Sequence, residues 1–244
     1  MERKPKIAIL RWEQGLVPEG LKQLDALPGN STNEASYPFP VKLVPVDGAC
    51  VETVITNPSQ KLLEDMIAIS KKMIEEDGIK GIATSCGFNA VFQKQMADAL
   101  DVPVFSSSLM QVPFVQNIIG RDKTVAVITA NKSALTKVHF EACGIGDDIN
   151  YEVYGLEDAK EWSKIFDKPD ESFDMDVVEQ EIVETAKAAV AGNPNIGGIV
   201  LECTDLPPFA KKISAAVNLP VFDFNSMMGY MAVVLGEMSL YESK

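Results

Sequence analysis

The chain has 244 residues, of which 46% are hydrophobic and 23% are charged, and these proportions are typical of a globular protein. Its formal net charge of −13 would repel a polyanion, so we expect no nucleic-acid partner. No apolar run approaches the ~20 residues that span a bilayer, and the first apolar stretch is too short for a signal peptide. We therefore expect a cytoplasmic protein with no membrane partner. Four widely spaced cysteines and one histidine form no metal-binding motif and no disulfide framework, which predicts neither a metal nor another cofactor.

Apolar runs separated by turn residues predict alternating strands and helices in the first half of the chain. Strands are expected at residues 6–10, 41–46, 79–85 and 102–105. A helix is expected from Pro58 to Gly78, because apolar side chains recur there at helical spacing, and a second helix at residues 89–100. Residues 28–40 are expected to be loop, and residues 47–57 fit no regular element.

The second half of the chain repeats this alternation. Strands are expected at residues 124–129, 197–201 and 221–224. Helices are expected from a cap at Ser133 to Gly144 and at residues 174–191, 208–217 and 226 to about 240. Residues 145–173 have no clear period. The alternation of strand and helix predicts an α/β protein with parallel sheets covered by helices on both faces.

Two segments of the chain carry one pattern. The apolar run 81–85 ends at Cys86 and the run 198–202 ends at Cys203, which is an offset of 117 residues. The same offset pairs Phe92 with Phe209, Lys94 with Lys211, and residues 103–105 with 220–222. A duplicated strand–cysteine–helix–strand unit would place two thiols at equivalent points of two similar lobes.

Cys86 and Cys203 each follow a predicted strand and precede a predicted helix. Ligands of open parallel sheets bind outside the carboxyl ends of the strands, and the N-terminus of a helix favours a thiolate. Two equivalent thiols across a cleft could remove a proton from one face of a carbon and return it to the other, as stereoinversion requires. The alternative is that each cysteine is a small core residue. Their matched positions favour the functional interpretation.

The two cysteine segments resemble motifs of the aspartate/glutamate racemase superfamily. Residues 84–89 (Thr-Ser-Cys-Gly-Phe-Asn) are similar to its first cysteine motif, and residues 201–207 (Leu-Glu-Cys-Thr-Asp-Leu-Pro) to its Gly-Cys-Thr-x-x-Pro pattern. The resemblance covers most of the chain and implies two pseudo-symmetric Rossmann-like lobes with the active site in the cleft between them. It also implies that residues 1–115 form the first lobe and residues 116–216 the second, while residues 217–244 cross back to complete the first.

Several positions beside the cysteines depart from the family pattern. Arg11 and Trp12 stand where glutamate racemases have an Asp-Ser pair and aspartate racemases have glycines. Gly87 replaces the Asn that usually follows the first cysteine, and Asp205 replaces the His that follows Cys-Thr in glutamate racemases. These changes keep both cysteines and leave the substrate open.

Polar residues near the cysteines and strand ends are candidate substrate-binding residues: Arg11, Thr84, Ser85, Asn89, Thr129, Asn131 and Thr204. Carboxylates bind well where loops meet helix N-termini, and the resemblance implies that the loop after residues 124–129 also contacts a substrate carboxylate. Each Ser, Thr or Asn could instead cap a helix or form a turn, and Arg11 could form a surface salt bridge. Glu202 and Asp205 could tune the thiols or could be solvated acids.

These features predict a cofactor-independent isomerase. We expect a racemase or epimerase of a small amino acid or related carboxylate, with Cys86 and Cys203 as the acid/base pair. One alternative is a cysteine-dependent cis–trans isomerase of an unsaturated diacid, and another is a non-catalytic binding protein for small acids. We also expect a homodimer or another homo-oligomer, and structural roles for Cys143 and His139.

Overall fold

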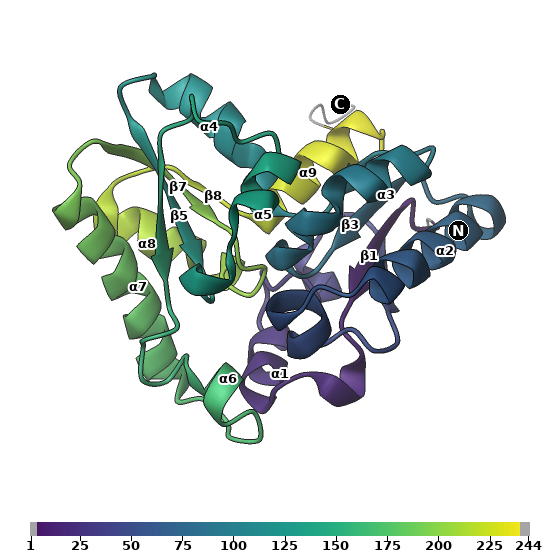
Figure 1. Ribbon diagram of the computed structural model, residues 1–244, viewed down its shortest axis with the longest axis horizontal. Coiled ribbons are helices and arrows are strands. Elements are labelled where there is room, and N and C mark those ends of the chain that lie inside the picture. The colour runs from purple at the N-terminus through teal and green to yellow at the C-terminus, as the bar shows by residue number, and fades with distance from the viewer. Residues whose placement is uncertain (1–3, 240–244) are drawn as a thin grey trace.

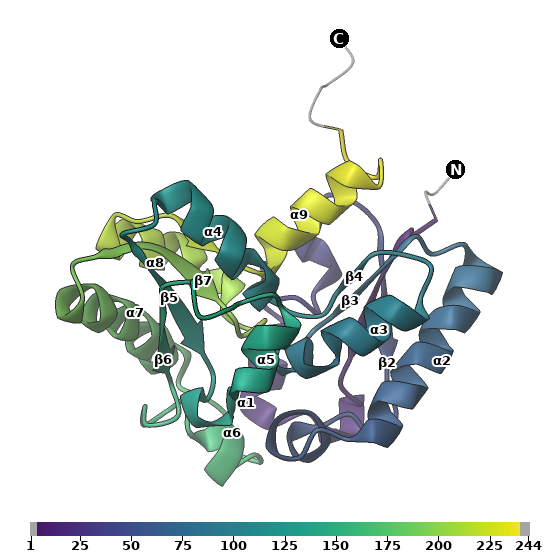
Figure 2. The same ribbon diagram turned by 45° about the horizontal axis from the view of Figure 1, so that its top comes forward.

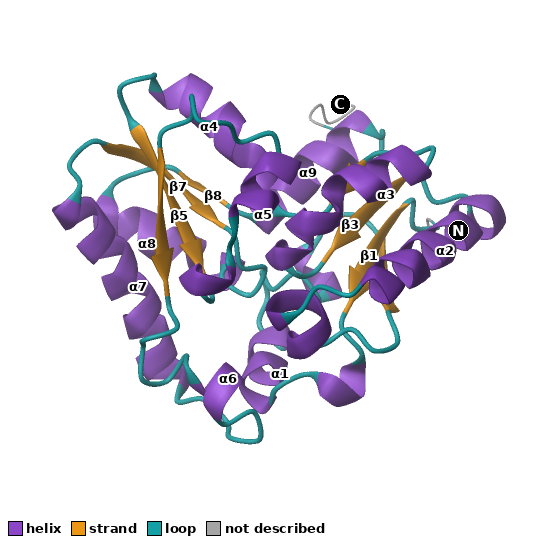
Figure 3. Cartoon of the chain, in the orientation of Figure 1, coloured by secondary structure: helices purple, strands orange, loops and turns teal. Residues whose placement is uncertain are grey.

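The structure is a computed structural model in which residues 4–239 are described, and two parallel four-stranded sheets organise it (Figures 1 and 3). The first sheet has the order β2-β1-β3-β4 and consists of β1 (Ile7–Arg11), β2 (Val41–Pro45), β3 (Gly81–Thr84) and β4 (Val104–Phe105). The second has the order β6-β5-β7-β8 and consists of β5 (Thr124–Thr129), β6 (Tyr151–Gly155), β7 (Ile196–Leu201) and β8 (Val221–Phe222). These sheets confirm the predicted α/β fold with two similar lobes.

Helices cover both faces of each sheet, which explains why the central strands are continuous apolar runs. Around the first sheet lie α2 (Gln60–Asp77), α3 (Gln93–Ala99) and α9 (Phe224–Val234). Around the second lie α4 (Val112–Ile119), α5 (Lys137–Ala142), α7 (Met175–Gly192) and α8 (Ala210–Val217). Two short helices, α1 (Glu19–Asp25) and α6 (Lys164–Asp167), contact each other where the lobes meet (Figures 1 and 2). No helix within residues 4–239 is long and apolar enough to cross a membrane.

The C-terminal helix joins the end of the chain to the first lobe. β8 still pairs with β7 in the second sheet, whereas the methionines of α9 pack in one buried cluster with Ile7 and Ile9 of β1. Gly81, at the start of β3, makes room for this helix, because a Cβ atom there would lie 2.5 Å from Cε of Met231. The chain thus returns to the first lobe after β8. The domain boundaries themselves stay a prediction. Residues 235–239 of the expected final helix lie beyond the end of α9, and residue 240 lies outside the described residues.

Several elements differ from the sequence prediction, among them α1 and α4, at whose positions no helix is expected. The expected helix from Ser133 is broken. A short turn occupies residues 132–134, and α5 begins only after Thr136. The backbone N–H of Thr136 donates to Nδ1 of His139 (3.1 Å) at this start of the helix. The stretch 145–173, which has no period in sequence, contains β6 and α6. β6 is an edge strand whose residues are exposed or half-buried, so it lacks the apolar run that marks a central strand.

Candidate functional site

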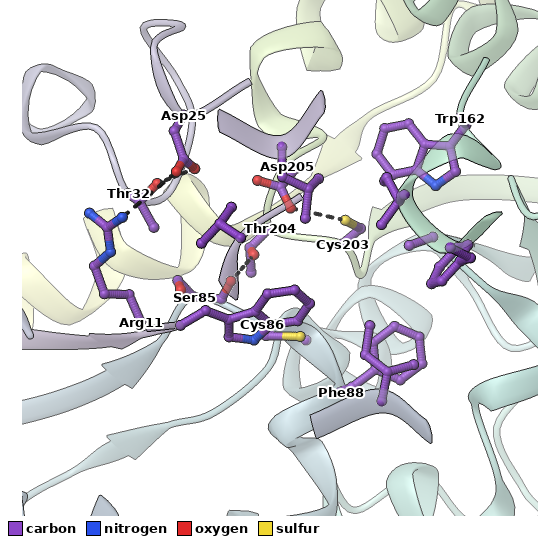
Figure 4. Close-up of a pocket in the computed structure, with 18 residues that line it drawn as sticks. Arg11, Asp25, Thr32, Ser85, Cys86, Phe88, Trp162, Cys203, Thr204 and Asp205 are labelled. Atoms are coloured by element: carbon purple, nitrogen blue, oxygen red, sulfur yellow. Dashed lines mark hydrogen bonds and ion pairs between the residues drawn. The ribbon is translucent and has the colours of Figure 1, made fainter. Parts of the chain in front are cut away.

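A pocket lies where the carboxyl ends of the two sheets face each other (Figure 4). Its lining includes, from the first lobe, Arg11, Trp12, Asp25, Thr32, Ser85, Cys86 and Phe88. From the second lobe it includes Trp162, Phe166, Cys203, Thr204 and Asp205. The structure therefore brings both predicted cysteines to one pocket between the lobes.

The two cysteine loops are held by the same backbone bond in each lobe. The N–H of Ser85 donates to the carbonyl of Leu10 (2.8 Å), and the N–H of Glu202 donates to the carbonyl of Ile128 (2.8 Å). The hydroxyl of Thr204 donates across the cleft to the carbonyl of Ser85. Each of the two backbone bonds ties the residue before a cysteine to the end of the neighbouring central strand. The duplicated sequence therefore produces a duplicated loop geometry, and Thr204 locks the two loops together.

Both thiols are nearly enclosed, since Cys86 and Cys203 are each 8% exposed. Burial raises the pKa of the Cys86 thiol well above its usual value, and the carboxyl groups of Glu202 and Asp205 raise it further. Burial also raises the pKa of Cys203 well above its usual value, followed by the effects of Asp205 and Glu202. These surroundings therefore favour protonated thiols, and a positive charge in the pocket would favour the thiolates.

Cys203 has a carboxyl partner in Asp205, two residues further along the chain. Its Sγ–H donates to Oδ2 of Asp205 (3.7 Å), while Nδ2 of Asn30 donates to Oδ1 (2.8 Å). Burial and the nearby Asp25 raise the pKa of Asp205 to about 7. Asp205 therefore changes its charge near neutral pH, and its anion is placed to accept the hydrogen bond from Cys203.

Cys86 has a different environment. The backbone N–H of Phe88 and the indole N–H of Trp12 face its sulfur, and both lower the pKa of the thiol, against the larger effect of burial. The indole nitrogen of Trp12 has no hydrogen-bond partner among the described residues. Cys86 is thus a buried thiol next to N–H groups, whereas Cys203 donates a hydrogen bond to a carboxyl group.

Arg11 is the only lysine or arginine among the residues described as lining the pocket. Its Nη2 lies 3.8 Å from Oδ2 of Asp25, and the side chains of the pair are 20% and 23% exposed. The hydroxyl of Thr32 also donates to Asp25 (2.5 Å). In Figure 4 the Arg11 guanidinium and the side chains of Phe88 and Trp162 lie on opposite sides of the two sulfur atoms. The pocket has a cationic end and an aromatic end.

Four of the predicted binding residues lie outside the pocket lining. The hydroxyl of Thr84 donates to the carbonyl of Ser106 (2.7 Å), and that of Thr129 donates to Glu202 (2.7 Å). Asn131 caps the turn at residues 132–134, and Asn89 is buried behind Cys86, to whose carbonyl its backbone N–H donates (3.1 Å). Arg11, Ser85 and Thr204 do line the pocket. A role in substrate binding stays a prediction for all seven residues.

Sequence reasoning missed the pocket residues contributed by α1 and by the region around α6. Asp25, Thr32, Trp162 and Phe166 belong to segments that have no counterpart in the 117-residue repeat. A tryptophan and phenylalanines within the otherwise acidic stretch 145–173 were the available signal. Buried aromatic side chains in a stretch without regular period indicate a segment that packs over another part of the protein.

Comparison with known proteins gives two kinds of relative, and no protein-family model matches the chain. The chain is 32% identical over 205 residues to a dimethylsulfoniopropionate lyase of Durusdinium sp. clade D, a match that covers 81% of this chain and 66% of that protein. It is 34% identical over 158 residues to dimethylsulfoniopropionate lyase 3 of Emiliania huxleyi, which covers 62% of this chain and 41% of that protein. The chain thus spans between about two fifths and two thirds of these two lyases.

Solved structures share the fold at low sequence identity. An aspartate racemase homologue from Pyrococcus horikoshii superposes with a TM-score of 0.60 at 18% identity, covering 97% of this chain and all of that one (100%). Allantoin racemase from Pseudomonas fluorescens gives 0.58 at 14% identity, covering 98% of this chain and 94% of that one. A mutant of arylmalonate decarboxylase gives 0.59 at 16% identity, covering 98% and 97%. The chain therefore has the fold of the aspartate/glutamate/hydantoin racemase-like superfamily, as the cysteine motifs predict.

The sequence relatives contradict the predicted activity. The curated relatives, at 28% to 34% identity, are lyases, whereas the racemases resemble this chain in fold alone. The prediction of a racemase or epimerase, and with it the isomerase class, is wrong. The two alternatives, a cis–trans isomerase and a non-catalytic binding protein, are overturned by the same relatives. Two cysteines in this fold do not specify stereoinversion, because an elimination also begins with removal of a proton from carbon.

Proposed function

We propose that this chain is a carbon–sulfur lyase that splits dimethylsulfoniopropionate or a close analogue. The observation that carries the proposal is a pair of thiols on one pocket in a chain that is 32% identical over 205 residues to a dimethylsulfoniopropionate lyase. The sequence similarity supports the reaction class, and the pocket supplies the groups that the reaction needs. The substrate is a small zwitterion with a carboxylate at one end and a dimethylsulfonium cation on the β-carbon.

The reaction is an elimination that requires one base. A thiolate removes a proton from the carbon next to the carboxylate, and the electrons of that C–H bond form the carbon–carbon double bond. The bond between the β-carbon and the sulfonium sulfur breaks, and its electron pair leaves with neutral dimethyl sulfide. The other product is acrylate, and the proton resides on the thiol until it passes to solvent. Because the leaving group is already cationic, it needs no acid to protonate it.

Cys203 is the base that the contacts favour. Its S–H points to Asp205, whose pKa of about 7 suits it to receive the thiol proton near neutral pH. Burial and the two nearby acids oppose the thiolate, and the sulfonium cation of the substrate would offset that opposition. The thiolate would then form chiefly when substrate is bound. Cys86, whose sulfur faces two N–H donors, is the alternative base.

The two ends of the pocket suit the two ends of the zwitterion. Arg11 can form a charge-assisted pair with the carboxylate in exchange for its long contact with Asp25. The rings of Phe88 and Trp162 offer aromatic faces to the sulfonium group, and a cation gains from such faces when water is excluded. Asp205 adds a negative charge beside the reacting carbons. This arrangement places the acidic carbon of the substrate between the charged groups and next to the thiols.

The proposal is tested by supplying dimethylsulfoniopropionate to the purified protein and measuring dimethyl sulfide in the headspace by gas chromatography. We expect wild-type turnover and a loss of about 10³-fold in kcat for Cys203→Ser, the range of a lost general base. Cys143→Ser is the matched control, since Cys143 is buried (9% exposed) but lies outside the pocket lining.

Three outcomes separate the claims. If wild-type protein releases no dimethyl sulfide from dimethylsulfoniopropionate, the lyase proposal fails. If Cys86→Ser loses activity and Cys203→Ser retains it, the lyase stands and the base is Cys86. If all three serine variants match wild type, thiol chemistry is not involved.

The finer expectations from the sequence stay predictions. A small carboxylate remains the expected ligand class, and the zwitterion named above is its specific form. A homodimer or other homo-oligomer is still expected, and light scattering on the purified protein would decide it. A cytoplasmic location is also still a prediction.

A further inference from the structure

One buried acid next to the thiols takes no part in the steps above. Glu202, at the end of β7, is 0% exposed and precedes Cys203. Its Oε2 accepts a hydrogen bond from the hydroxyl of Thr129 (2.7 Å), a side chain that is also 0% exposed. Its Oε1 has no hydrogen-bond partner among the described residues. Burying a carboxyl group that has one oxygen without a hydrogen bond costs far less free energy when the group is a neutral acid than when it is an anion.

Gly87, on the opposite lobe, leaves the space that this carboxyl group occupies. A Cβ atom at Gly87 would lie 2.2 Å from Oε1 of Glu202 and 2.3 Å from its backbone carbonyl oxygen. Any side chain at position 87 would therefore collide with Glu202. The residue after the first cysteine and the residue before the second cysteine thus fit each other directly. Gly87 stands where the first motif usually has Asn, and Glu202 stands where the second motif has Gly. The small residue at position 87 leaves room for the larger one at position 202.

Glu202 lies near three thiols and another acid, and a hydroxyl donates to it. A negative charge on it raises the pKa of Cys86, of Cys203 and of Cys143, the last of which reaches about 12 chiefly through burial. Asp205 is the acid that acts on Glu202, and among the described residues no lysine or arginine affects its pKa. Burial, followed by the repulsion from Asp205, raises the pKa of Glu202 to about 7, against the hydrogen bond from Thr129. Its charge therefore changes near neutral pH, behind both thiols.

We propose that Glu202, seated in the space left by Gly87, is a positioning acid whose neutral form permits thiolate formation at Cys86 and Cys203 and whose anion opposes it. Glu202 does not line the pocket, so it acts through the thiols and not on the substrate. The consequence for turnover rests on the lyase function proposed above, whereas the consequence for the thiols does not. If Asp205 must be ionised and Glu202 must be neutral, the pair shares one proton in the active state.

The direct test is the rate at which iodoacetamide alkylates each cysteine, followed by peptide mass spectrometry from about pH 6 to pH 10. We compare wild type with Glu202→Gln and with Glu64→Gln, an exposed acid on α2, as the control. In Glu202→Gln we expect alkylation of Cys86 and Cys203 at pH 8 to be faster by about tenfold, which corresponds to one pKa unit. Cys50, half-buried and outside the site, serves as the internal standard and should not change. Wild-type rates at Cys86 and Cys203 in Glu202→Gln would overturn the proposal.

A second pair of variants tests the contact between Gly87 and Glu202. Gly87→Ala should lower the melting temperature, because the new methyl group meets both the carboxyl group and the backbone carbonyl of Glu202. Adding Glu202→Gly to the same chain removes only the first of these clashes and should restore part of the loss. If Gly87→Ala alone is as stable as wild type, the proposed contact does not exist.

The pH profile of turnover then links the acid to the reaction. Wild-type kcat/KM on dimethylsulfoniopropionate should be bell-shaped around neutral pH, because ionisation of Asp205 gives the rise and ionisation of Glu202 gives the fall, and Glu202→Gln should remove the fall. A fall that persists unchanged in Glu202→Gln would contradict the proposal. Absence of wild-type turnover together with faster alkylation in Glu202→Gln would reject the lyase function and leave the role of Glu202 intact.

Discussion

At the scale of single residues, the site places weak acids around thiols that must lose a proton. Cys86 and Cys203 are buried beside Asp205 and Glu202, and every one of these neighbours disfavours a second negative charge. Such a pocket is poorly suited to an anionic substrate and well suited to one that carries a cation. Arg11, the single cation that the described lining provides, lies away from Phe88 and Trp162 (Figure 4). The charges therefore favour a zwitterion bound in one orientation.

Asp205→Asn should remove the acceptor for the Cys203 proton. We expect kcat to fall by about 10²-fold, the lower range for loss of proton-transfer assistance. Because burial raises the pKa of Asp205 to about 7, its anion forms as pH rises through that value and should give the rising limb of a bell-shaped activity profile, whose falling limb is the ionisation of Glu202. The variant should lose this rise, as measured by kcat/KM against pH. A variant with the wild-type profile would show that Asp205 does not receive the proton.

Arg11→Gln should weaken substrate binding more than it slows the chemical step. A charge-assisted hydrogen bond contributes about 1.5–3 kcal/mol, so we expect KM to rise by roughly 10- to 100-fold with a smaller change in kcat. Arg121→Gln is the control, because Arg121 is exposed in the turn before β5. Steady-state kinetics of both variants measure the effect. Equal KM values for the two variants would remove Arg11 from the proposed carboxylate contact.

At the scale of elements, α9 holds the end of the chain on the first sheet. Met231 is 0% exposed and packs with Ile7 and Ile9 of β1, while its neighbour Tyr230 is 64% exposed. The two residues thus provide a buried and an exposed position on one helix.

Met231→Ala should lower the free energy of unfolding by about 2–5 kcal/mol, because it leaves a cavity in a packed core. Tyr230→Ala should change it by less than about 0.5 kcal/mol. Urea unfolding followed by circular dichroism measures both values. Similar values for the two variants would contradict the packing of α9 described above.

Elements that are buried on both faces could be predicted from the sequence, and exposed or inserted ones could not. β5 matches its predicted bounds because residues 124–129 form an apolar run, whereas the edge strand β6 has no such run. The cysteines were found because they recur in a repeated unit. Asp25 and Trp162 were not found, because α1 and the region around α6 lie outside that unit and reach the pocket only through tertiary packing. The reaction class was mistaken because both stereoinversion and elimination start from the same proton transfer.

At the scale of the whole molecule, the two lobes meet through contacts concentrated at the site. Nδ2 of Asn30 donates to Asp205, and the hydroxyl of Thr204 donates to the carbonyl of Ser85. The chain also carries a formal net charge of −13, which repels anions at long range. A zwitterion with no net charge escapes this repulsion, whereas acrylate, the product of the proposed reaction, does not. In that reaction the overall charge would favour product release.

This charge predicts a dependence on salt that distinguishes product from substrate. Acrylate, added as an inhibitor, should bind more tightly as NaCl rises from about 20 to 500 mM, because salt screens the repulsion. The kcat/KM for dimethylsulfoniopropionate should change by less than about twofold over the same range. Inhibition assays at several salt concentrations give both values. Acrylate affinity that falls with salt would indicate that local cations outweigh the net charge.

The most direct test of an elimination that begins with a thiol base uses dimethylsulfoniopropionate deuterated at the carbon next to the carboxylate. NMR follows the reaction as acrylate and dimethyl sulfide form. We expect the two products in equal amounts, slower turnover of the deuterated than of the ordinary substrate, and no turnover by the Cys86→Ser/Cys203→Ser double variant. Equal rates for the two substrates together with full activity of the double variant would contradict the proposed reaction.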